Sequence, residues 1–118
     1  MSYFPMRADV LEIDMREPFI PRVPVMVEAA AEAFNLTAHD ILSRRRGKRV
    51  ATGRMAVYWL ARNATPMSLP EIGRMVGKRD HTTVLHGIAR CEERREKDST
   101  YRAVTDALLR AVTERITV

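Results

Sequence analysis

The residues best suited to chemistry gather in one stretch, Val76–Arg90, with the sequence VGKRDHTTVLHGIAR. It combines a carboxylate, two adjacent hydroxyls, two imidazoles and several cations. The Asp80 carboxylate can accept a hydrogen bond from cytosine N4, and the methyl groups of Thr82 and Thr83 can pack on a thymine methyl. This is the chemistry of base-edge and phosphate recognition. Two alternatives are that Asp80 is only a helix N-cap and that His81 simply packs inward.

Catalytic and metal chemistry fit the sequence poorly. A nuclease built on Asp80 and the histidines would need paired carboxylates to hold a metal, and the sequence offers no such pair. The three histidines, His39, His81 and His86, lack ligand spacing and a partner cysteine cluster. Neither Gly-Lys pair is a phosphate-binding loop, because the first glycine of that motif is missing in both. We therefore expect no enzyme, no cofactor and no metal.

Helical periodicity extends over almost the whole chain, without a strand pattern or a repeat. The predicted helices cover residues 24–35, 37–43, 50–64, 68–76 and 81–97, and a last one starts at Ser99 with an apolar stripe from Tyr101 to Ile116. In the helix at 50–64 the residues expected to face inward are Val50, Val57, Leu60 and Ala61. Tyr58 and Trp59 should cover the ends of that helix. The sequence predicts an all-α, multi-helix domain.

The fourth and fifth predicted helices form a helix-turn-helix. Ser68 and Glu71 have capping-box spacing at the start of the first, Gly77 ends it, and Asp80 caps the second. On a helical wheel, the core face of the second helix holds Val84, Leu85, Ile88 and Cys91, and the opposite face holds Thr82, Thr83, His86 and Arg90. Gly87 and Ala89, small residues beside the polar face, should allow close approach to a groove.

Positive charge is concentrated in the middle of the chain. Residues 1–32 have six acids and three bases, residues 33–91 three acids and eleven bases, and residues 92–118 six of each. The run RRRGKRVATGR holds six bases and no acid, and we expect it to form a loop that leads into the next helix. Gly47 beside Arg46 would let that arginine reach an A·T-rich minor groove. The alternative is a solvated basic loop or a general polyanion patch.

Length and composition indicate one small globular domain. The chain has 118 residues, of which 46% are hydrophobic and 30% charged, so it is too short for two cores. No apolar run approaches a membrane span and no secretory signal is visible, so we expect a cytoplasmic, nucleoid-associated protein without membrane contact. The one cysteine, Cys91, fits a reducing compartment and is expected to be a small apolar residue rather than a redox group.

The segment SLPEIGRMVGKRDHTTVLHGIAR, preceded by DILSRRRGKRV, resembles the C-terminal DNA-binding domain (domain IV) of the bacterial replication initiator DnaA. The resemblance covers residues 23–97, and the last helix more loosely. It implies a TrpR-like, DnaA domain IV-like fold that recognises an asymmetric box of the TTATNCACA type. By this likeness Asp80, His81 and Thr82 would read bases in the major groove, and Arg46 would enter the minor groove. Together with the charge pattern, it assigns phosphate contacts to Arg44, Arg45, Lys48, Arg54, Arg62, Ser68, Leu69, Pro70, Lys78, Arg79, Thr83, His86 and Arg90.

The chain departs from the family pattern in several places. Lys78 stands where a second glycine is common. Gly53 replaces a usual proline and should loosen the start of its helix, and Met55 replaces a polar residue that often contacts the DNA backbone. The chain has no room for the initiator's ATPase module, so nucleotide-driven oligomerisation and origin melting are not expected.

Two functions remain open. The first is sequence-specific binding of double-stranded DNA that regulates replication initiation or transcription, by a monomer because an asymmetric box does not need two half-sites. The second is a protein-interaction role toward the initiator or its inactivating partners, suggested by an acidic, apolar leader arm at residues 1–22. The DNA-binding domain would occupy residues 23–118, and the initiating Met1 and the divergent arm favour a complete protein.

Overall fold

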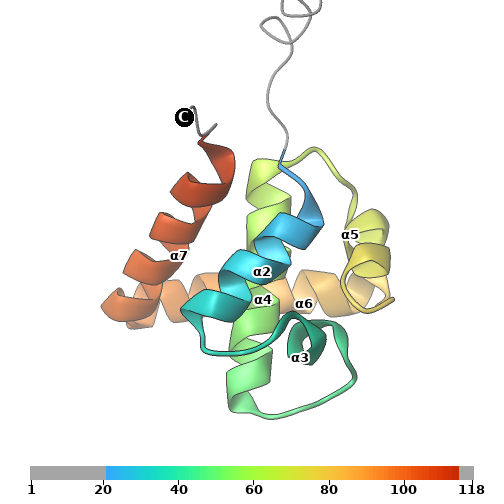
Figure 1. The fold of residues 1–118 in the computed structure, drawn as a ribbon, viewed down its shortest axis with the longest axis horizontal. Coiled ribbons are helices and arrows are strands. Elements are labelled where there is room, and N and C mark those ends of the chain that lie inside the picture. Colours follow the sequence, from blue (N-terminus) through green and yellow to red (C-terminus); the bar gives the residue numbers. More distant parts are fainter. Residues whose placement is uncertain (1–20, 115–118) are drawn as a thin grey trace, which may run out of the picture.

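The computed structural model describes residues 21–114, and this range folds into six helices without a strand. The helices are α2 (Val23–Ala33), α3 (Ala38–Leu42), α4 (Lys48–Ala64), α5 (Leu69–Met75), α6 (His81–Lys97) and α7 (Ser99–Thr113), as shown in Figure 1. The predicted all-α class is confirmed. Of the helices in the described range, none is long and apolar enough to cross a membrane. Nearly all of the predicted leader arm, and Ile116, lie outside the described residues.

Local sequence signals set the starts of three helices. Thr37 and Asp40 form a capping box at α3, and Ser68 and Glu71 form one at α5. In each box the hydroxyl accepts from a backbone N–H of the first turn, and the carboxylate accepts from the N–H of the capping residue. Asp80 caps α6 by accepting from two backbone N–H groups. The structure confirms these predicted helix starts. They could be predicted because a cap depends only on residues that are close together in the sequence.

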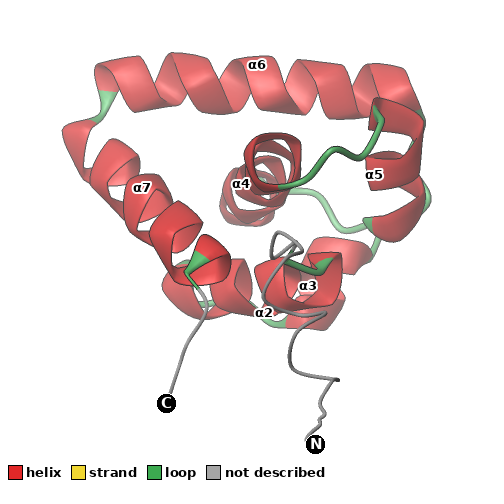
Figure 2. Ribbon diagram, turned by 90° about the horizontal axis from the view of Figure 1, so that it is seen from above, coloured by secondary structure: helices red, strands yellow, loops and turns green. Residues whose placement is uncertain are grey.

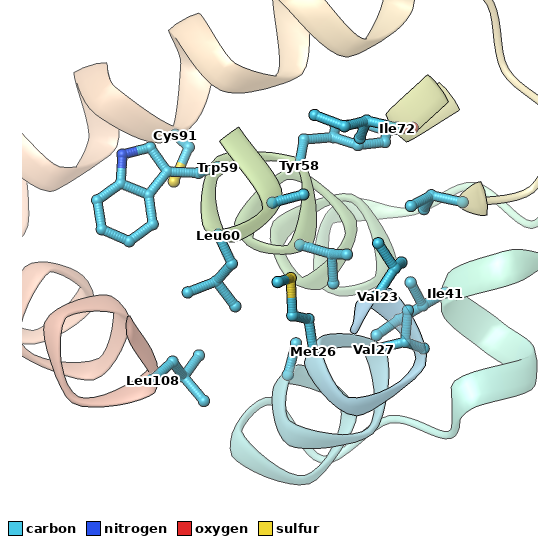
Figure 3. Packing of buried hydrophobic residues seen from close by; sticks show 14 of the residues in the cluster. Val23, Met26, Val27, Ile41, Tyr58, Trp59, Leu60, Ile72, Cys91 and Leu108 are labelled. Carbon is cyan, nitrogen blue, oxygen red and sulfur yellow. The ribbon is translucent and has the colours of Figure 1, made fainter. Parts of the chain in front are cut away.

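Helix α4 is the centre of the core. Figure 2 shows it nearly end-on, enclosed by the other helices, and Figure 3 shows the apolar side chains packed around it. Val57, Leu60 and Ala61 are fully buried as predicted. Tyr58 and Trp59 are only 3% and 5% exposed. The prediction that these two aromatic residues cover the helix ends is therefore wrong, because both lie within residues 56–61 of α4, all of which are buried against the neighbouring helices.

Arg95 of α6 contacts both α4 and α7. Its guanidinium lies 4.3 Å above the centre of the Trp59 ring. The same group donates to Thr105 Oγ1 at 2.6 Å and to Asp106 Oδ1 at 2.8 Å, both on α7. A cation over an indole face is an attractive contact, and here it is combined with an ion pair. One arginine of α6 thus joins α4 to α7.

The basic run differs from its predicted form. Helix α4 begins at Lys48, so only residues 43–47 connect α3 to α4 and the rest of the run is helical. Gly47, with a φ of 128°, stands at the N-cap position. Gly53 is buried within α4, which begins at Lys48, so this glycine lies inside the helix rather than at its start. A Cβ there would lie 2.6 Å from Leu36 Cδ1, so the glycine permits close packing.

Candidate nucleic-acid interface

A tight turn between α5 and α6 builds the helix-turn-helix. The Arg79 N–H donates to the Gly73 carbonyl at 2.8 Å and closes the turn. Gly77 and Lys78 reverse the chain with left-handed φ values of 78° and 57°. Glycine adopts this conformation easily, which gives a physical reason for a glycine pair at these positions. Lys78 adopts the same left-handed conformation as Gly77, although lysine has a Cβ. Its side chain places an exposed cation on the turn.

The first turn of α6 presents the residues predicted to read bases. Asp80 Oδ1 accepts from the N–H groups of Thr82 and Thr83 at 2.6 and 3.2 Å, and these bonds lower the pKa of the carboxyl group. Both cap bonds go to Oδ1, so the capping role leaves Oδ2 for a ligand. His81 and Thr82 are both exposed. The alternative that His81 packs inward is therefore wrong.

The core face of α6 is narrower than the helical wheel predicts. Val84, Ile88 and Cys91 are buried as expected, whereas Leu85 is 51% exposed. The prediction for Leu85 is wrong because α6 rests on α4 and α5 along one stripe, and the wheel cannot say how wide that stripe is. Thr83, His86 and Arg90 are exposed on the polar side, as expected.

Gly87 serves the packing of α6 rather than the surface. It is buried, and a Cβ at this position would lie 2.8 Å from Cε2 of the Tyr58 ring. The expectation that Gly87 opens the helix to a groove is therefore wrong. Its missing side chain instead lets α6 cross α4 directly above an aromatic ring.

Two predicted phosphate ligands, Arg54 and Arg79, also hold the fold together. Arg54 donates to three carbonyl oxygens at the end of α3, which belong to Asp40 (3.0 Å), Ile41 (2.8 Å) and Ser43 (2.9 Å). Arg79 donates to Val76 O at 3.0 Å and to Ser43 O at 2.6 Å. The two guanidinium groups therefore meet at one carbonyl. Sequence reasoning missed this structural role, because no local pattern marks an arginine whose partners lie in other elements.

Eight further predicted DNA-binding residues lie at or just beyond the two ends of α4. At its start, Arg44, Arg46 and Lys48 are exposed, and Arg45 pairs with Asp40 at 2.8 Å. Toward its other end, Arg62 is exposed, and the chain then continues to the start of α5. There Ser68 is exposed with its hydroxyl used in the capping box, Leu69 is half-buried and Pro70 is exposed. At 1.5 Å per residue, Lys48 and Arg62 are about 21 Å apart along the helix.

A groove of about 320 Å³ runs between α4 and α6, within this span. It brings together five of the predicted phosphate ligands, which are Arg54, Arg79, Thr83, His86 and Arg90. It also includes Tyr58, which sequence reasoning did not select. The structure thus combines a basic groove with an exposed polar helix start.

In residues 21–114 no three His, Cys, Asp or Glu side chains gather in a way that could hold a metal ion. Cys91 is fully buried, and burial raises the pKa of its thiol to about 11, so the group stays protonated at neutral pH. This agrees with the predicted role as a small apolar core residue.

Fold and site together define a helix-turn-helix domain of the nucleic-acid-binding class. Residues 25–91 match the family described as bacterial dnaA protein helix-turn-helix, and the chain belongs to this family. The family is a DNA-binding domain and not an enzyme.

Several curated relatives are chromosomal replication initiator proteins DnaA. The chain is 50% identical to the one from Caulobacter vibrioides strain NA1000 over 72 residues, which is 61% of this chain and 15% of the relative. It is 35% identical to that of Rhodopseudomonas palustris strain HaA2 over 116 residues, 93% of this chain and 25% of the relative. The protein of Bartonella quintana is 40% identical over 93 residues. The chain thus spans a quarter or less of the length of these relatives.

Proposed function

We propose that this protein binds double-stranded DNA in a sequence-specific way, at asymmetric sites of the TTATNCACA type. The observation that carries the proposal is the exposed first turn of α6, where Asp80, His81 and Thr82 stand together beside a basic groove. Side chains at the start of a recognition helix are the ones that reach base edges in the major groove. Arg46 in the α3–α4 connection would enter the adjacent minor groove.

The similarity to replication initiators supports a role at the sites that such initiators use. Occupancy of these sites by a monomer would regulate replication initiation or transcription without ATP hydrolysis. The exposed cations toward both ends of α4 would contact the phosphates on either side of the bases that α6 reads.

Fluorescence anisotropy with a TTATCCACA duplex and a scrambled duplex, at two salt concentrations, tests this function. Thr82→Ala should cost about 1–3 kcal/mol on the box and little on the scrambled duplex, because base contacts carry sequence information and phosphate contacts do not. Thr113→Ala, an exposed change on α7, is the matched control. An equal loss on both duplexes would contradict base reading by Thr82.

A protein-interaction role is the second candidate. The acidic, apolar residues 1–22 precede the matched family segment at 25–91, and DNA binding gives them no role. Their deletion should abolish capture of the initiator or its inactivating partners while DNA affinity stays unchanged. Unchanged capture would exclude the arm as the interaction site.

A further inference from the structure

A second groove, of about 480 Å³, lies where α2 and α6 end and α4 and α7 begin. Phe34, Tyr101 and Val104 give it an apolar floor, and the ring centroids of the two aromatic residues are 5.7 Å apart. Phe34 and Val104 are only half-buried, although both pack against the core. A floor of this kind is stabilised when further apolar side chains cover it, because that removes apolar surface from water.

Cations surround the apolar floor of this groove. Lys48 and Arg49, at the start of α4, are exposed. The guanidinium of Arg94, on α6, lies 5.0 Å from the centre of the Tyr101 ring. One carboxylate, that of Asp98, also lines the groove, where it caps α7 and lies 3.7 Å from Arg94. Three cations against one carboxylate leave the rim positive, so the groove suits an apolar segment that carries acidic residues.

The leader arm contains a segment with this pattern. Residues 8–15, with the sequence ADVLEIDM, hold three acidic residues and no base. Four larger apolar residues alternate with the acids, and they are Val10, Leu11, Ile13 and Met15. The other end of the chain does not match the groove, since residues 115–118, RITV, have one base and no acidic side chain.

The arm is also long enough to reach the groove. It joins α2 at Val23, whereas Phe34 follows the other end of that helix. At 1.5 Å per residue these two positions are about 16 Å apart. Met15 precedes Val23 by eight positions, and an extended chain of that length spans up to about 26 Å. Residues 8–15 can therefore return along α2 and lie over the groove.

We propose that residues 8–15 of the leader arm dock into this groove of the same molecule. Apolar side chains of the segment cover Phe34 and Val104, and its carboxylates lie beside the cations of the rim. The inference goes beyond the proposed function, because it gives the arm a binding site within the protein itself.

Zero-length carbodiimide cross-linking of the full-length protein, followed by digestion and mass spectrometry, tests this docking. The reagent joins a lysine amine to a carboxylate when the two groups are in contact. The chain has three lysines, and one of them, Lys48, lies on the rim of the groove. We expect a cross-link between Lys48 and a carboxylate of residues 8–15.

The other two lysines are internal controls. Lys97 pairs with Glu93 at 3.2 Å, so the cross-link between these two residues shows that the reagent has reacted. Lys78 lies on the turn of the helix-turn-helix, away from the groove, and it is exposed. It should form no cross-link to residues 8–15.

Substitutions on the arm and on the groove test the two parts of the contact separately. Leu11→Ser keeps every carboxylate and removes one large apolar side chain, so the yield of the Lys48 cross-link should fall about 3-fold to 10-fold. Phe4→Ser, in the arm but outside the segment, should leave that yield unchanged. Arg49→Gln removes a cation from the rim and should lower the yield, whereas Arg62→Gln, toward the other end of α4, should not.

Three results would overturn the inference. The first is the absence of a cross-link between Lys48 and residues 8–15 while Lys97 and Glu93 are joined. The second is an unchanged yield in Leu11→Ser or in Arg49→Gln. The third is a cross-link that joins isotope-labelled to unlabelled protein in an equal mixture, because the arm would then dock on a second copy. The measurement contains no DNA, so its failure leaves the proposed function untouched.

Discussion

At the scale of single residues, Lys78 has a left-handed backbone conformation, which is unfavourable for a residue with a Cβ. Its φ of 57° is left-handed, which costs a residue with a Cβ about 1–2 kcal/mol. Lys78→Gly should raise the free energy of unfolding by about 0.5–1 kcal/mol, because relief of this strain exceeds the extra entropy that glycine loses on folding. Urea denaturation at neutral pH measures this change.

The same substitution removes a cation from the turn. DNA affinity should therefore fall on specific and scrambled duplexes alike, although the protein becomes more stable. Lys78→Ala is the control, because it removes the charge and keeps the Cβ. If both variants have the same stability, the left-handed turn stores no strain.

At the scale of elements, three helix starts depend on ionised carboxylates. Hydrogen bonds from backbone N–H groups lower the pKa of Asp40, Glu71 and Asp80. A carboxyl group with a lowered pKa in the folded state stabilises the fold at pH values above its unfolded pKa, and that contribution disappears as the pH falls through the folded pKa. The free energy of unfolding should therefore be constant from pH 7 to about pH 5 and fall below about pH 4.

Urea titrations at a series of pH values measure this loss. Asp80→Asn is the control, because asparagine caps a helix without titrating. Its stability should fall less steeply between pH 5 and pH 3 than that of the unsubstituted protein. Identical pH profiles would show that the ionisation of Asp80 does not contribute to the cap.

The elements also show which features a sequence can predict. Capping boxes such as Ser68 with Glu71 are local, so they identify helix starts directly. The base-reading candidates Asp80 to Thr82 follow from such a start. Whether Leu85 is covered depends on where neighbouring helices cross, which no periodicity contains. Arg79 and its acceptor on Ser43 are 36 positions apart. The sequence therefore does not reveal that an arginine of the basic groove also holds the fold together.

At the scale of the whole molecule, α4 crosses α6, and exposed cations predicted to contact DNA lie toward both ends of α4. Arg46→Ala and Arg62→Ala remove cations toward opposite ends of α4, and each should reduce the slope of log K against log salt by about 1. Arg46→Ala should also weaken the preference for an A·T-rich box, because only this side chain is proposed to enter the minor groove. Anisotropy titrations over a salt series measure both effects. An unchanged slope for Arg62→Ala would place that end of α4 away from DNA.

The contact between Arg95 and the Trp59 ring has an optical consequence. Trp59 is the one tryptophan of the chain, and it is buried where α4, α6 and α7 meet. Its emission therefore depends on whether α7 is packed against the core. Detachment of that helix would expose the indole and shift the emission spectrum to longer wavelength. The helix-turn-helix lies at the other end of α6, so a ligand bound there leaves the indole covered. The protein thus contains its own fluorophore, one that distinguishes loss of the folded core from occupation of the binding face.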